Sequence, residues 1–566
     1  MAQPAQCRSL VEPPRIIGDG ELPHWDRTVD VVVVGFGAAG AAAALQARED
    51  SGEVLIVDRF EGGGASAYSG GVIYAGATRY QRESGVEDSV EETFKYLSVE
   101  MGGTVPERTL REYARESGSN LDWLAGHGVP FSGKVYEHKT ILPPDGTYLY
   151  YAGNEKVAPY NVSAKPAPRG HKVVGSGMTG HVLFAALQAA LRRTHIDVLT
   201  HSPATRLILD SRSRVVGVEI CSLPQHLHAA HQDLYRKVAP MVPFDGPRTE
   251  RAIRDCRAME IAAQGERRLI RARRGVVLAT GGFQHNLQMV AAARPFIAAN
   301  YRSLMRLGSM GNDGSGVELG QSAGADVALM DSMYLGRTLA PPNALLKGLL
   351  VNRQGERFIN EEAYTGFVGN AIAEQPAGEA WLLLRASNFW TAVRESLGSG
   401  SVVFRYYGLP TLLNVIMGGT RRATSIRRLA SKCGIDADGL ERTIAAYNRI
   451  ADGLEPDPLE KSRTNIEPFR DEAFYAVRES ISNRFAFTHM FTLGGLTVDP
   501  DSGAVTRADG SSIPGLYAAG RVAVGLCSRR YVSGMSLGDC IFSGRRAARH
   551  AMVGARAAPA AAGALR

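Results

Sequence analysis

Three glycines and an aspartate near the start of the chain have the spacing of a nucleotide-binding site. Gly35, Gly37 and Gly40 form a GxGxxG pattern, and Asp58 follows the next apolar strand. In such a pattern the first glycine permits a tight turn, the second lets a pyrophosphate approach the backbone, and the third lets a helix pack closely on a strand. The aspartate accepts a hydrogen bond from a ribose hydroxyl. These residues indicate a nucleotide site; the alternative is a glycine-rich turn without a ligand.

The elements that must position these residues lie directly beside them. Val31–Val34 is a short β-branched run, which is typical of a buried parallel strand, and Val54–Val57 is a second apolar strand that ends at the aspartate. Between the two, an alanine-rich helix is predicted over Ala41–Arg48. The start of this helix would present unpaired backbone N–H groups to the phosphates.

A second glycine-rich stretch, from Glu61 to Thr78, follows the second strand. It contains Ser66, Ser69, Gly70 and Gly71. A backbone this rich in glycine can lie against a flat or anionic ligand, because few side chains cover its amide groups. We therefore expect this loop to face the ligand, and the alternative is a flexible surface loop.

Elements of the nucleotide domain recur later in the chain. Ala204–Leu209 and Val215–Ile220 look like strands of a small antiparallel unit, a strand ending at Ala279–Gly282 returns to the domain, and Ile513–Gly520 adds to it near the C-terminus. We predict an α/β fold in which a Rossmann-like domain, with a parallel sheet plus a small antiparallel crossover sheet, is interrupted by an inserted α+β domain. The predicted division is a leader over residues 1–28, the first part of the nucleotide domain over 29–293, the inserted domain over 294–480, and the second part over 481–566 with a frayed tail after 554.

The composition excludes several other classes of protein. The chain has 566 residues, is 45% hydrophobic and 21% charged, and carries a net charge of +7, which are ordinary values for a globular protein. No basic block with interleaved aromatic residues points to nucleic acid. No signal peptide and no apolar run long enough to cross a membrane is present. The cysteines do not form CxxC pairs, so free thiols in a reducing cytoplasm are expected. They are Cys7, Cys221, Cys256, Cys433, Cys527 and Cys540.

A polar segment from Ser222 to Gln264 interrupts the antiparallel unit. It contains His226, His228 and His231, followed by charged residues at helical spacing. We predict a solvated helical insertion and no metal site. Its scattered leucines and valines leave open a peripheral membrane or subunit contact. We refer to this segment as the 222–264 insertion.

Five tyrosines and three prolines fall between Tyr136 and Tyr160. We predict an aromatic loop here rather than a regular element. Such loops can form the wall of an apolar pocket.

Taken in order, these motifs resemble one family of flavoproteins. The GxGxxG pattern with Asp58, the loop at Gly63–Gly71, the ATGG of Ala279–Gly282 and the GLYAAG of Gly515–Gly520 are similar to those of the FAD-dependent family of fumarate reductase, succinate dehydrogenase flavoprotein and 3-ketosteroid dehydrogenases. The resemblance covers almost everything from Val31 to Met552. It implies a non-covalently bound FAD. With no second valid nucleotide fingerprint, an NAD(P)H reductase is disfavoured.

By this resemblance, particular residues contact particular parts of FAD. The pyrophosphate lies on the turn from Gly35 to Gly40, Asp313 is near the isoalloxazine, and the amides of Ser536 and Leu537 place a helix dipole on the flavin pyrimidine edge, which becomes anionic on reduction. The full implied set is Gly35, Gly37, Ala38, Ala39, Gly40, Asp58, Arg59, Ser66, Ser69, Gly70, Gly71, Thr280, Gly281, Asp313, Gly520, Arg521, Ser536 and Leu537.

Within the family, the catalytic positions distinguish two kinds of substrate. Fumarate reductases clamp a dicarboxylate with a histidine and arginines, and here the matching positions hold Phe491 and Tyr531. Their proton-route arginine, which follows the RFxNE motif, is also missing around Tyr364. A site that has lost these charges binds a carboxylate poorly and suits a large neutral substrate with a polar end. A fumarate-reductase-like enoate reductase is therefore the weaker alternative.

The replacements resemble the ketosteroid dehydrogenase branch. Tyr531 and Ser533 resemble the Tyr-x-Ser of 3-ketosteroid Δ4-(5α)-dehydrogenases, and Tyr334 resembles their second active-site tyrosine. The resemblance implies that a 3-oxo-5α-steroid is oxidised to its 4-ene. Tyr531, tuned by Ser533, takes the proton next to the ketone, Tyr334 assists, and hydride passes to flavin N5. The backbone N–H of Gly534 or Gly494 would polarise the carbonyl.

Two other functions stay open at this point. In a 3-ketosteroid Δ1-dehydrogenase, the base would come from the Tyr136–Tyr160 loop. In a flavin-binding protein without turnover, Tyr531 would only pack against the flavin. With no haem or cluster motif in the sequence, an external electron acceptor is expected.

Overall fold

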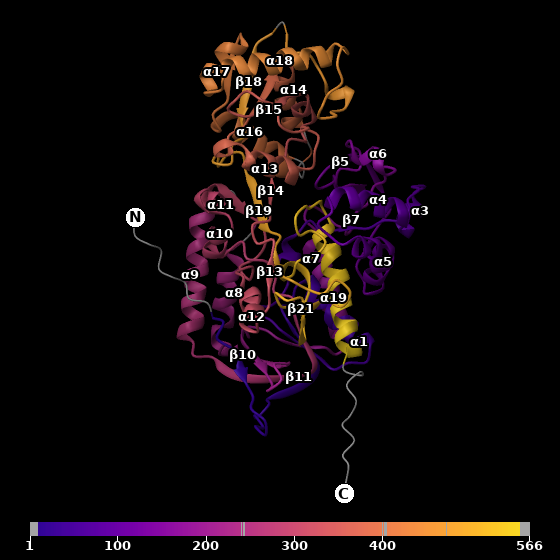
Figure 1. The fold of residues 1–566 in the computed structure, drawn as a ribbon, viewed down its shortest axis with the longest axis vertical. Coiled ribbons are helices and arrows are strands. Elements are labelled where there is room, and N and C mark those ends of the chain that lie inside the picture. Colours follow the sequence, from indigo (N-terminus) through magenta and orange to yellow (C-terminus); the bar gives the residue numbers. More distant parts are fainter. Residues whose placement is uncertain are drawn as a thin grey trace.

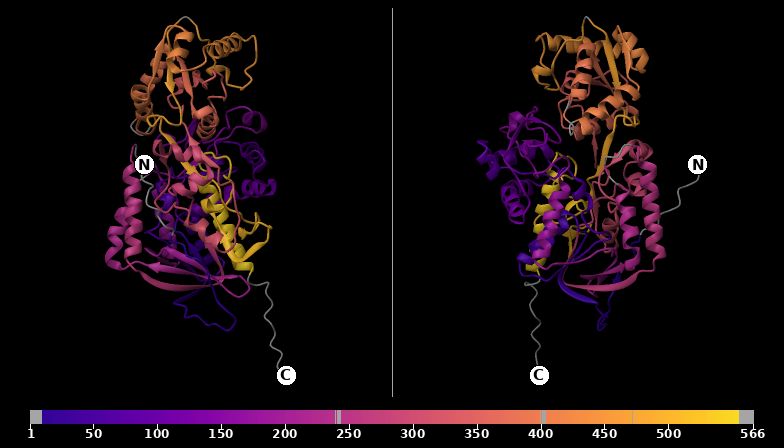
Figure 2. Two further views of the ribbon diagram at one scale, coloured as in Figure 1. Left: turned by 60° about the vertical axis from the view of Figure 1, so that its left-hand side comes forward. Right: turned by 180° about the vertical axis from the view of Figure 1, so that it is seen from behind.

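The computed structural model describes residues 10–238, 240, 244–398, 400, 404–470 and 472–554 (Figure 1). It is a mixed α/β molecule with several sheets. A large sheet and its helices form the lower part in Figure 1, and residues from the middle of the chain, coloured orange, form the upper part. Strands β14 (Met333–Gly336) and β19 (Thr488–Thr492) lie between these two parts, and Figure 2 shows them from two further sides.

The main sheet joins strands from the start, the middle and the end of the chain. Val31 and Val33 of its central strand pack on one face, and Val32 and Val34 pack on the other. Helices α1 (Ala38–Glu49) and α19 (Met535–Gly554) cover the first face, which is why the strand is an unbroken run of valines. The parallel strands are β2 (Arg27–Val34), β3 (Val54–Val57), β8 (Asp197–Leu199), the second half of β11 (Glu266–Leu278) and β22 (Ser512–Ala518).

The antiparallel unit is part of the main sheet and not a separate one, which corrects the predicted arrangement. The first half of β11 pairs antiparallel with β10 (Val215–Ser222), and β10 pairs with β9 (Ala204–Leu209). On its other edge β11 pairs in parallel with β2 from Ile270 to Leu278, with an irregularity between Ala272 and Gly275, and its second half also pairs in parallel with β22. A single 13-residue strand therefore serves both units.

The predicted loose leader is also partly structured. β1 (Arg15–Ile16) pairs in parallel with β9 at the edge of the main sheet. An edge strand can recruit a short segment because its backbone groups are otherwise unpaired. Residues 1–9 and the tail after 554 lie outside the described residues.

The tyrosine-rich stretch forms strands where a loop was predicted. β5 (Val135–Lys139) and β6 (Leu149–Tyr151) join β7 (Gly170–Lys172) and β4 (Val72–Tyr74) in a four-stranded sheet. Tyrosine favours strands, and the proline pair falls in the connection between β5 and β6. The sheet is covered by α4 (Val90–Met101) and α5 (Glu107–Gly126).

The upper part of the molecule is built on a second four-stranded antiparallel sheet. Leu382 and Leu384 point to one face and Leu383 to the other. Helices α14 (Ala386–Gly398) and α16 (Leu409–Met417) contact the first face, and α17 (Ile426–Cys433) and α18 (Ala437–Ala451) belong to the core on the second. Its strands run in the order β15 (Leu349–Val351), β16 (Trp381–Arg385), β18 (Phe474–Arg478) and β17 (Arg421–Ala423).

The 222–264 insertion forms helices α8 (His228–Arg236) and α9 (Gly246–Ala262). Its apolar residues Leu223, Leu234 and Val238 are buried. They are therefore not exposed to an outside partner. Among the described helices, none is both long and apolar enough to cross a membrane.

Candidate active site

One cavity brings together most of the residues that the sequence singled out. Tyr334, Tyr531 and Ser533 line it. The predicted cofactor residues that line it are Gly35, Gly37, Ala38, Ala39, Asp58, Arg59, Ser66, Ser69, Gly70, Thr280, Gly281, Asp313, Arg521, Ser536 and Leu537. We call it the main cavity. Gly40, Gly71 and Gly520 do not line it.

Gly40 acts by letting two elements meet. A Cβ atom there would lie 1.9 Å from the carbonyl oxygen of Gly35, so the helix could not pack against the turn. Gly71 and Gly520 have positive φ angles of 67° and 68°, and each is closely surrounded by protein. These three glycines shape the backbone around the cavity and need not touch a ligand.

The start of α1 is built to receive an anion. Gly35 has a φ of 106°, and a Cβ there would lie 2.6 Å from the carbonyl oxygen of Ala279. The hydroxyl of Ser66 accepts a hydrogen bond from the N–H of Ala38 at 3.0 Å, which ties the glycine-rich loop to the first turn of the helix. At Gly37 an added Cβ would meet only Ser66 Oγ at 3.5 Å and the Gly63 carbonyl at 3.9 Å. A phosphate can therefore approach the backbone at this helix N-terminus.

The Asp58 carboxylate is held by two backbone groups. The N–H of Phe36 donates to one oxygen at 2.6 Å and the N–H of Phe60 to the other at 2.7 Å. Burial raises the pKa of Asp58, and the two N–H donors oppose that rise. Each oxygen keeps a second lone pair. The carboxylate can therefore accept from a ribose as predicted.

Arg59 and Asp313 bind each other. Arg59 donates to Asp313 at 2.7 Å and holds Glu260 of α9 with two hydrogen bonds, at 2.5 and 2.8 Å. Since Arg59 directly follows Asp58, this ion pair lies beside the ribose end of the main cavity. The expected position of Asp313 near the isoalloxazine stays a prediction.

The 222–264 insertion covers this end of the cavity. The Tyr235 ring lies 4.5 Å from that of Phe60, and His231 Nε2 lies 3.0 Å from Glu260 Oε1. His231 Nδ1 also lies 3.0 Å from His201 Nδ1. The helices of the insertion thus pack against the residues that follow Asp58 in the chain.

His231, Cys256 and Glu260 lie close enough together to hold a metal ion, but their chemistry does not fit one. Both oxygens of Glu260 are bound by Arg59. Burial raises the pKa of the Cys256 thiol to about 12, so the thiolate that a metal needs is not formed. Of the three histidines noted in the sequence, the ring of His228 stacks on His201.

Unpartnered polar atoms at the other side of the cavity fit a bound FAD. Nε and Nη1 of Arg521 are buried and have no hydrogen-bond partner within the described part of the chain, while Nη2 donates to the Leu493 carbonyl. The hydroxyl of Thr280 is likewise unpartnered. Leaving buried donors unsatisfied is costly, so a ligand that accepts hydrogen bonds is expected here.

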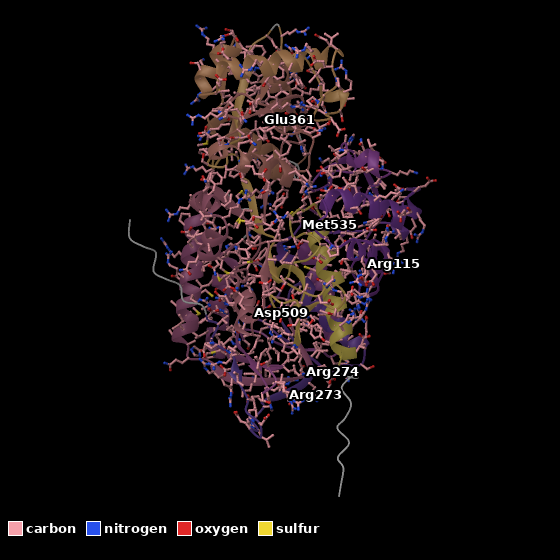
Figure 3. The ribbon with its side chains drawn as sticks, in the orientation of Figure 1. Arg115, Arg273, Arg274, Glu361, Asp509 and Met535 are labelled. Carbon is pink, nitrogen blue, oxygen red and sulfur yellow. The ribbon has the colours of Figure 1, made fainter. Side chains whose placement is uncertain are left out.

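Helix α19 points its N-terminus at the same region. Figure 3 labels Met535 at the end of α19 that faces the upper part of the molecule. Ser536 and Leu537, in its first turn, line the main cavity. The positive end of the helix dipole is therefore directed at whatever fills this region.

Aromatic rings gather where the cavity passes between β14, β19 and the start of α19. The Tyr531 ring lies 5.2 Å from Tyr334, 5.1 Å from Phe491 and 6.2 Å from Tyr364, centroid to centroid. We call these four residues the tyrosine cluster. The hydroxyl of Tyr334 is hydrogen-bonded to that of Thr365 at 2.8 Å.

Ser533 does not contact Tyr531 in the way the predicted relay requires. Its hydroxyl donates to the Ile141 carbonyl at 3.3 Å and lies 3.4 Å from the hydroxyl of Tyr150. Burial, with the neighbouring Tyr334, raises the pKa of Tyr531 above its usual value, and the Gly534 N–H and Arg521 oppose the rise. The backbone N–H of Gly534 and the charge of Arg521 are thus the groups that favour the phenolate of Tyr531.

Sequence reasoning missed several residues that line the cavity. Tyr364 was noted only for the arginine it replaces, and His489 and Thr338 were not considered. His489 lies two positions before Phe491 on β19, and alternate residues of a strand share a face. That spacing was the available signal. Burial lowers the pKa of His489 to about 4, so its imidazole is neutral.

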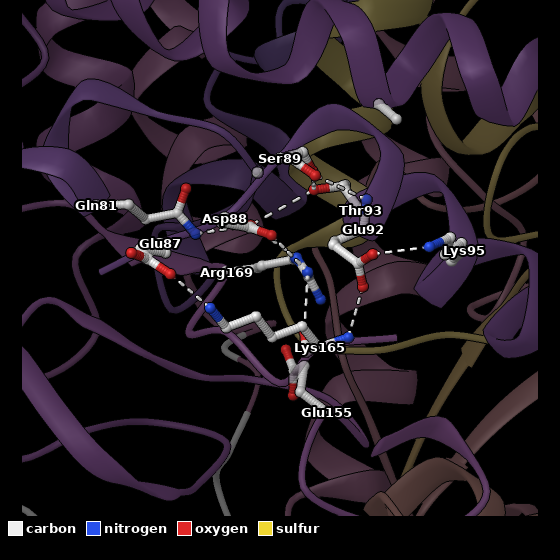
Figure 4. A network of polar contacts seen from close by, with 12 residues as sticks. Gln81, Glu87, Asp88, Ser89, Glu92, Thr93, Lys95, Glu155, Lys165 and Arg169 are labelled. Carbon is white, nitrogen blue, oxygen red and sulfur yellow. Dashed lines mark hydrogen bonds and ion pairs between the residues drawn. The ribbon is translucent and has the colours of Figure 1, made fainter. Parts of the chain in front are cut away.

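Two segments beside the tyrosine-rich sheet, Tyr150–Glu155 and Pro166–His171, support the site from behind. Arg169 is fully buried and binds Asp88 at 2.6 and 2.9 Å (Figure 4). Glu155 accepts from the hydroxyl of Tyr74 at 3.1 Å, and His171 is hydrogen-bonded to Thr78 at 2.9 Å. These contacts fix the sheet that carries Tyr150.

The fold and the site together define a FAD-dependent oxidoreductase. The chain belongs to the family described as FAD binding domain, whose model matches residues 30–537. It is 36% identical over 510 residues to the 3-oxo-5-alpha-steroid 4-dehydrogenase of Comamonas testosteroni, which covers 89% of this chain and 94% of that protein. It is 27% identical over 556 residues to a 3-oxosteroid 1-dehydrogenase of Mycolicibacterium smegmatis, which covers 89% and 93%.

A solved structure is similar over almost its whole length. It is the 3-ketosteroid-delta4-(5alpha)-dehydrogenase of Rhodococcus jostii RHA1 in complex with 4-androstene-3,17-dione, with a TM-score of 0.78 and 29% identity. The match covers 96% of this chain and 100% of that one.

Proposed function

We propose that this protein oxidises 3-oxo-5α-steroids to their 4-ene products. The observation that carries the proposal is the tyrosine cluster, which ends a cavity that starts at a nucleotide fingerprint. The four members of the cluster are uncharged, and the nearby Arg521 binds the Leu493 carbonyl and presents its remaining N–H groups where FAD is expected. The aromatic walls and hydroxyl groups of the cluster suit a large neutral ketone. The uncharged residues Phe491 and Tyr531, at the positions where fumarate reductases carry a histidine and an arginine, argue against a fumarate-reductase-like activity.

The chain's own residues divide the work as follows. Tyr531 takes the proton from C4, next to the ketone, and the electrons of that C–H bond form the C4–C5 double bond. Bound FAD supplies the acceptor for the hydride that leaves C5. Of the two glycines expected to polarise the carbonyl, Gly534 lines the cavity and supports this role, whereas Gly494 does not. Tyr334, held by Thr365, orients the substrate from the opposite wall.

A single experiment tests the reaction. The purified holoenzyme is incubated with 5α-androstane-3,17-dione without oxygen, and the products are identified by chromatography. We expect bleaching of the flavin absorbance and formation of the 4-ene. A 1-ene product would make the protein a Δ1-dehydrogenase, and no bleaching with any 3-ketosteroid would overturn the proposal.

The main alternative is the Δ1 reaction, for which the base would come from the tyrosine-rich stretch. Tyr150 of β6 approaches Ser533 but does not line the main cavity, and its hydroxyl donates to the Ile141 carbonyl at 2.8 Å. A buried, hydrogen-bonded phenol outside the cavity is a poor candidate for the base. This supports the 4-ene assignment.

Several wider assignments accompany the proposal. Residues 294–480 form the inserted domain that closes over the substrate, between the two parts of the FAD domain at 29–293 and 481–566. The electrons leave to an external acceptor. A membrane or subunit contact through the 222–264 insertion stays a prediction, although its apolar residues Leu223, Leu234 and Val238 are buried.

A further inference from the structure

Two neighbouring helices of the upper part expose large apolar side chains. The fractions exposed are 52% for Trp390 and 63% for Leu397 on α14, and 42%, 77% and 55% for Leu409, Ile416 and Met417 on α16. We call these five residues the α14–α16 patch. Single exposed apolar residues are normal on a protein surface, but a group on adjacent elements calls for an explanation.

The five residues lie on the outward sides of both helices. α14 and α16 contact each other, and both pack on the same face of the β15–β16–β18–β17 sheet, on which Phe389 and Val415 bury their side chains. Trp390 and Leu397 are two helical turns apart, as are Leu409 and Ile416, so each pair forms one stripe. The two stripes point away from the sheet, toward solvent.

Arginines surround the patch without acidic partners. Arg394, Arg405 and Arg422 are exposed. In the described residues none of the three is within ion-pair distance of a carboxylate. Arg422 lies opposite Tyr475 on the sheet, and the Tyr475 ring is 6.3 Å from Trp390, so the charge borders the apolar stripe. Apolar residues with a rim of unpaired arginines are typical of a surface that meets anionic headgroups.

We propose that the protein docks through the α14–α16 patch on the surface of an anionic phospholipid bilayer. The apolar side chains enter the boundary of the acyl chains, and the three arginines stay at the phosphates. A second copy of the chain fits less well, because a two-fold contact would place the same arginines against each other.

The patch adjoins the substrate cavity. Residues Phe404–Gly408 form one short helical turn that leads directly into α16, and Tyr406 and Tyr407 of this turn line the main cavity. A sterol-like substrate dissolves in the bilayer rather than in water. Docking would therefore bring the cavity to the phase that holds the substrate, a consequence that rests on the proposed function. The docking itself does not.

The test measures co-sedimentation of the holoenzyme with lipid vesicles in the absence of substrate. Vesicles of phosphatidylcholine are compared with vesicles that also contain phosphatidylglycerol. We expect binding to the mixed vesicles, weak binding to the neutral ones, and loss of binding at high salt. In the double variant I416E/M417E, binding falls at least about tenfold. In R394E/R422E the preference for anionic vesicles falls about thirtyfold, because each arginine adds to the attraction.

Leu22→Glu is the matched control, since Leu22 is 95% exposed and lies outside the patch. It should bind like the unaltered protein, and every variant must retain its FAD absorbance. Equal binding by I416E/M417E and the unaltered protein would overturn the proposal, as would no binding of the unaltered protein to either vesicle. A dimer in sedimentation that I416E/M417E disperses would assign the patch to a second copy instead. Because no substrate is present, these outcomes are independent of the steroid reaction.

Discussion

Tyr531 combines a central position with a difficult chemical task. Its ring contacts three members of the aromatic wall, and burial raises the pKa of its hydroxyl. The raised pKa means that Tyr531 holds its proton more strongly than a free tyrosine does, so the proposed base needs groups that favour its deprotonated form. The Gly534 N–H and Arg521 oppose the rise in the pKa of Tyr531, and they are the groups that can favour the phenolate.

We expect Tyr531→Phe to keep its FAD and lose turnover by about 10²- to 10⁴-fold, the usual contribution of positioned proton transfer. Flavin absorbance and steady-state rates with a 3-oxo-5α-steroid measure the two properties. Tyr447→Phe is the matched control, because Tyr447 is buried outside the cavity and its hydroxyl has no hydrogen-bond partner in the described residues. Unchanged turnover in Tyr531→Phe would remove the tyrosine from the reaction.

At the residue scale, the sequence was most informative where the chemistry is local. Gly35 and Asp58 belong to one short strand–helix–strand unit, and both line the main cavity. The pairing of Asp313 with Arg59 could not be predicted, since the two residues are distant in sequence. The contacts of Ser533 with Ile141 and Tyr150 also join distant parts of the chain and could not be predicted.

Paired residues of strands β14 and β19 mark successive positions along the main cavity. Tyr334 is opposite Phe491, and one pleat farther from the nucleotide end Gly336 is opposite His489. Two residues along a strand span about 7 Å. With the reacting ketone at Tyr531, the other end of a steroid extends toward His489 and Thr338, which also line the cavity.

We therefore expect His489→Phe to weaken recognition of an oxygen at the far end of the steroid. The neutral imidazole can donate one hydrogen bond, so KM for 5α-androstane-3,17-dione should rise about 2- to 10-fold. KM for 5α-androstan-3-one, which lacks the second oxygen, should not change. The comparison of the two substrates in both proteins isolates the contact. An equal rise for both substrates would show that the residue only shapes the wall.

The helix pair α8–α9 contributes a buried ion pair between Glu260 and Arg59. Glu260 of α9 is almost fully buried and binds Arg59 with both oxygens. Burial would raise the pKa of Glu260, but the Arg59 charge prevails and lowers it to about 2 from a usual 4.5. The carboxylate therefore stabilises the fold above about pH 5, and this contribution is lost as the pH falls toward 2.

Glu260→Gln should destabilise the protein by about 3 kcal/mol at neutral pH, because the buried Arg59 loses one of its two carboxylate partners and keeps only Asp313. FAD should also dissociate faster, since Arg59 directly follows Asp58. Thermal denaturation and FAD retention at a series of pH values measure both effects. The difference from the unaltered protein should narrow between pH 5 and pH 2. Glu266→Gln removes an exposed pair with Arg268 and serves as the control. A difference that is constant with pH would contradict the ion-pair explanation.

Elements with a strong local pattern were predicted well, and elements defined by pairing were not. Val54–Val57 is a strand with those bounds. The strands β5 and β6 were missed because tyrosines and prolines mixed in one stretch gave no alternation, and their pairing with β7 decides the structure. Likewise, nothing in the sequence of β11 indicates that its two halves pair with different neighbours in opposite directions.

At the scale of the whole molecule, the order of the motifs was the strongest guide. Pieces of one nucleotide domain at the start, middle and end of the chain predicted that distant strands share a sheet, and β2, β11 and β22 do so. The pairing of β1 with β9 could not be predicted, because a two-residue contact leaves no pattern. The α14–α16 patch could not be predicted either, because the sequence of an apolar helix does not show which of its side chains stay exposed.

The late arrival of β22 has a consequence during translation. β11 is complete at Leu278, yet the strand that pairs with its second half ends at Ala518, and α19 follows only after that. A nascent chain therefore carries an apolar, half-paired sheet while most of the remaining polypeptide is still being synthesised. Unpaired strand edges of this kind invite association with other chains. We therefore expect the ribosome-bound protein to need shielding by a chaperone until its last strand emerges.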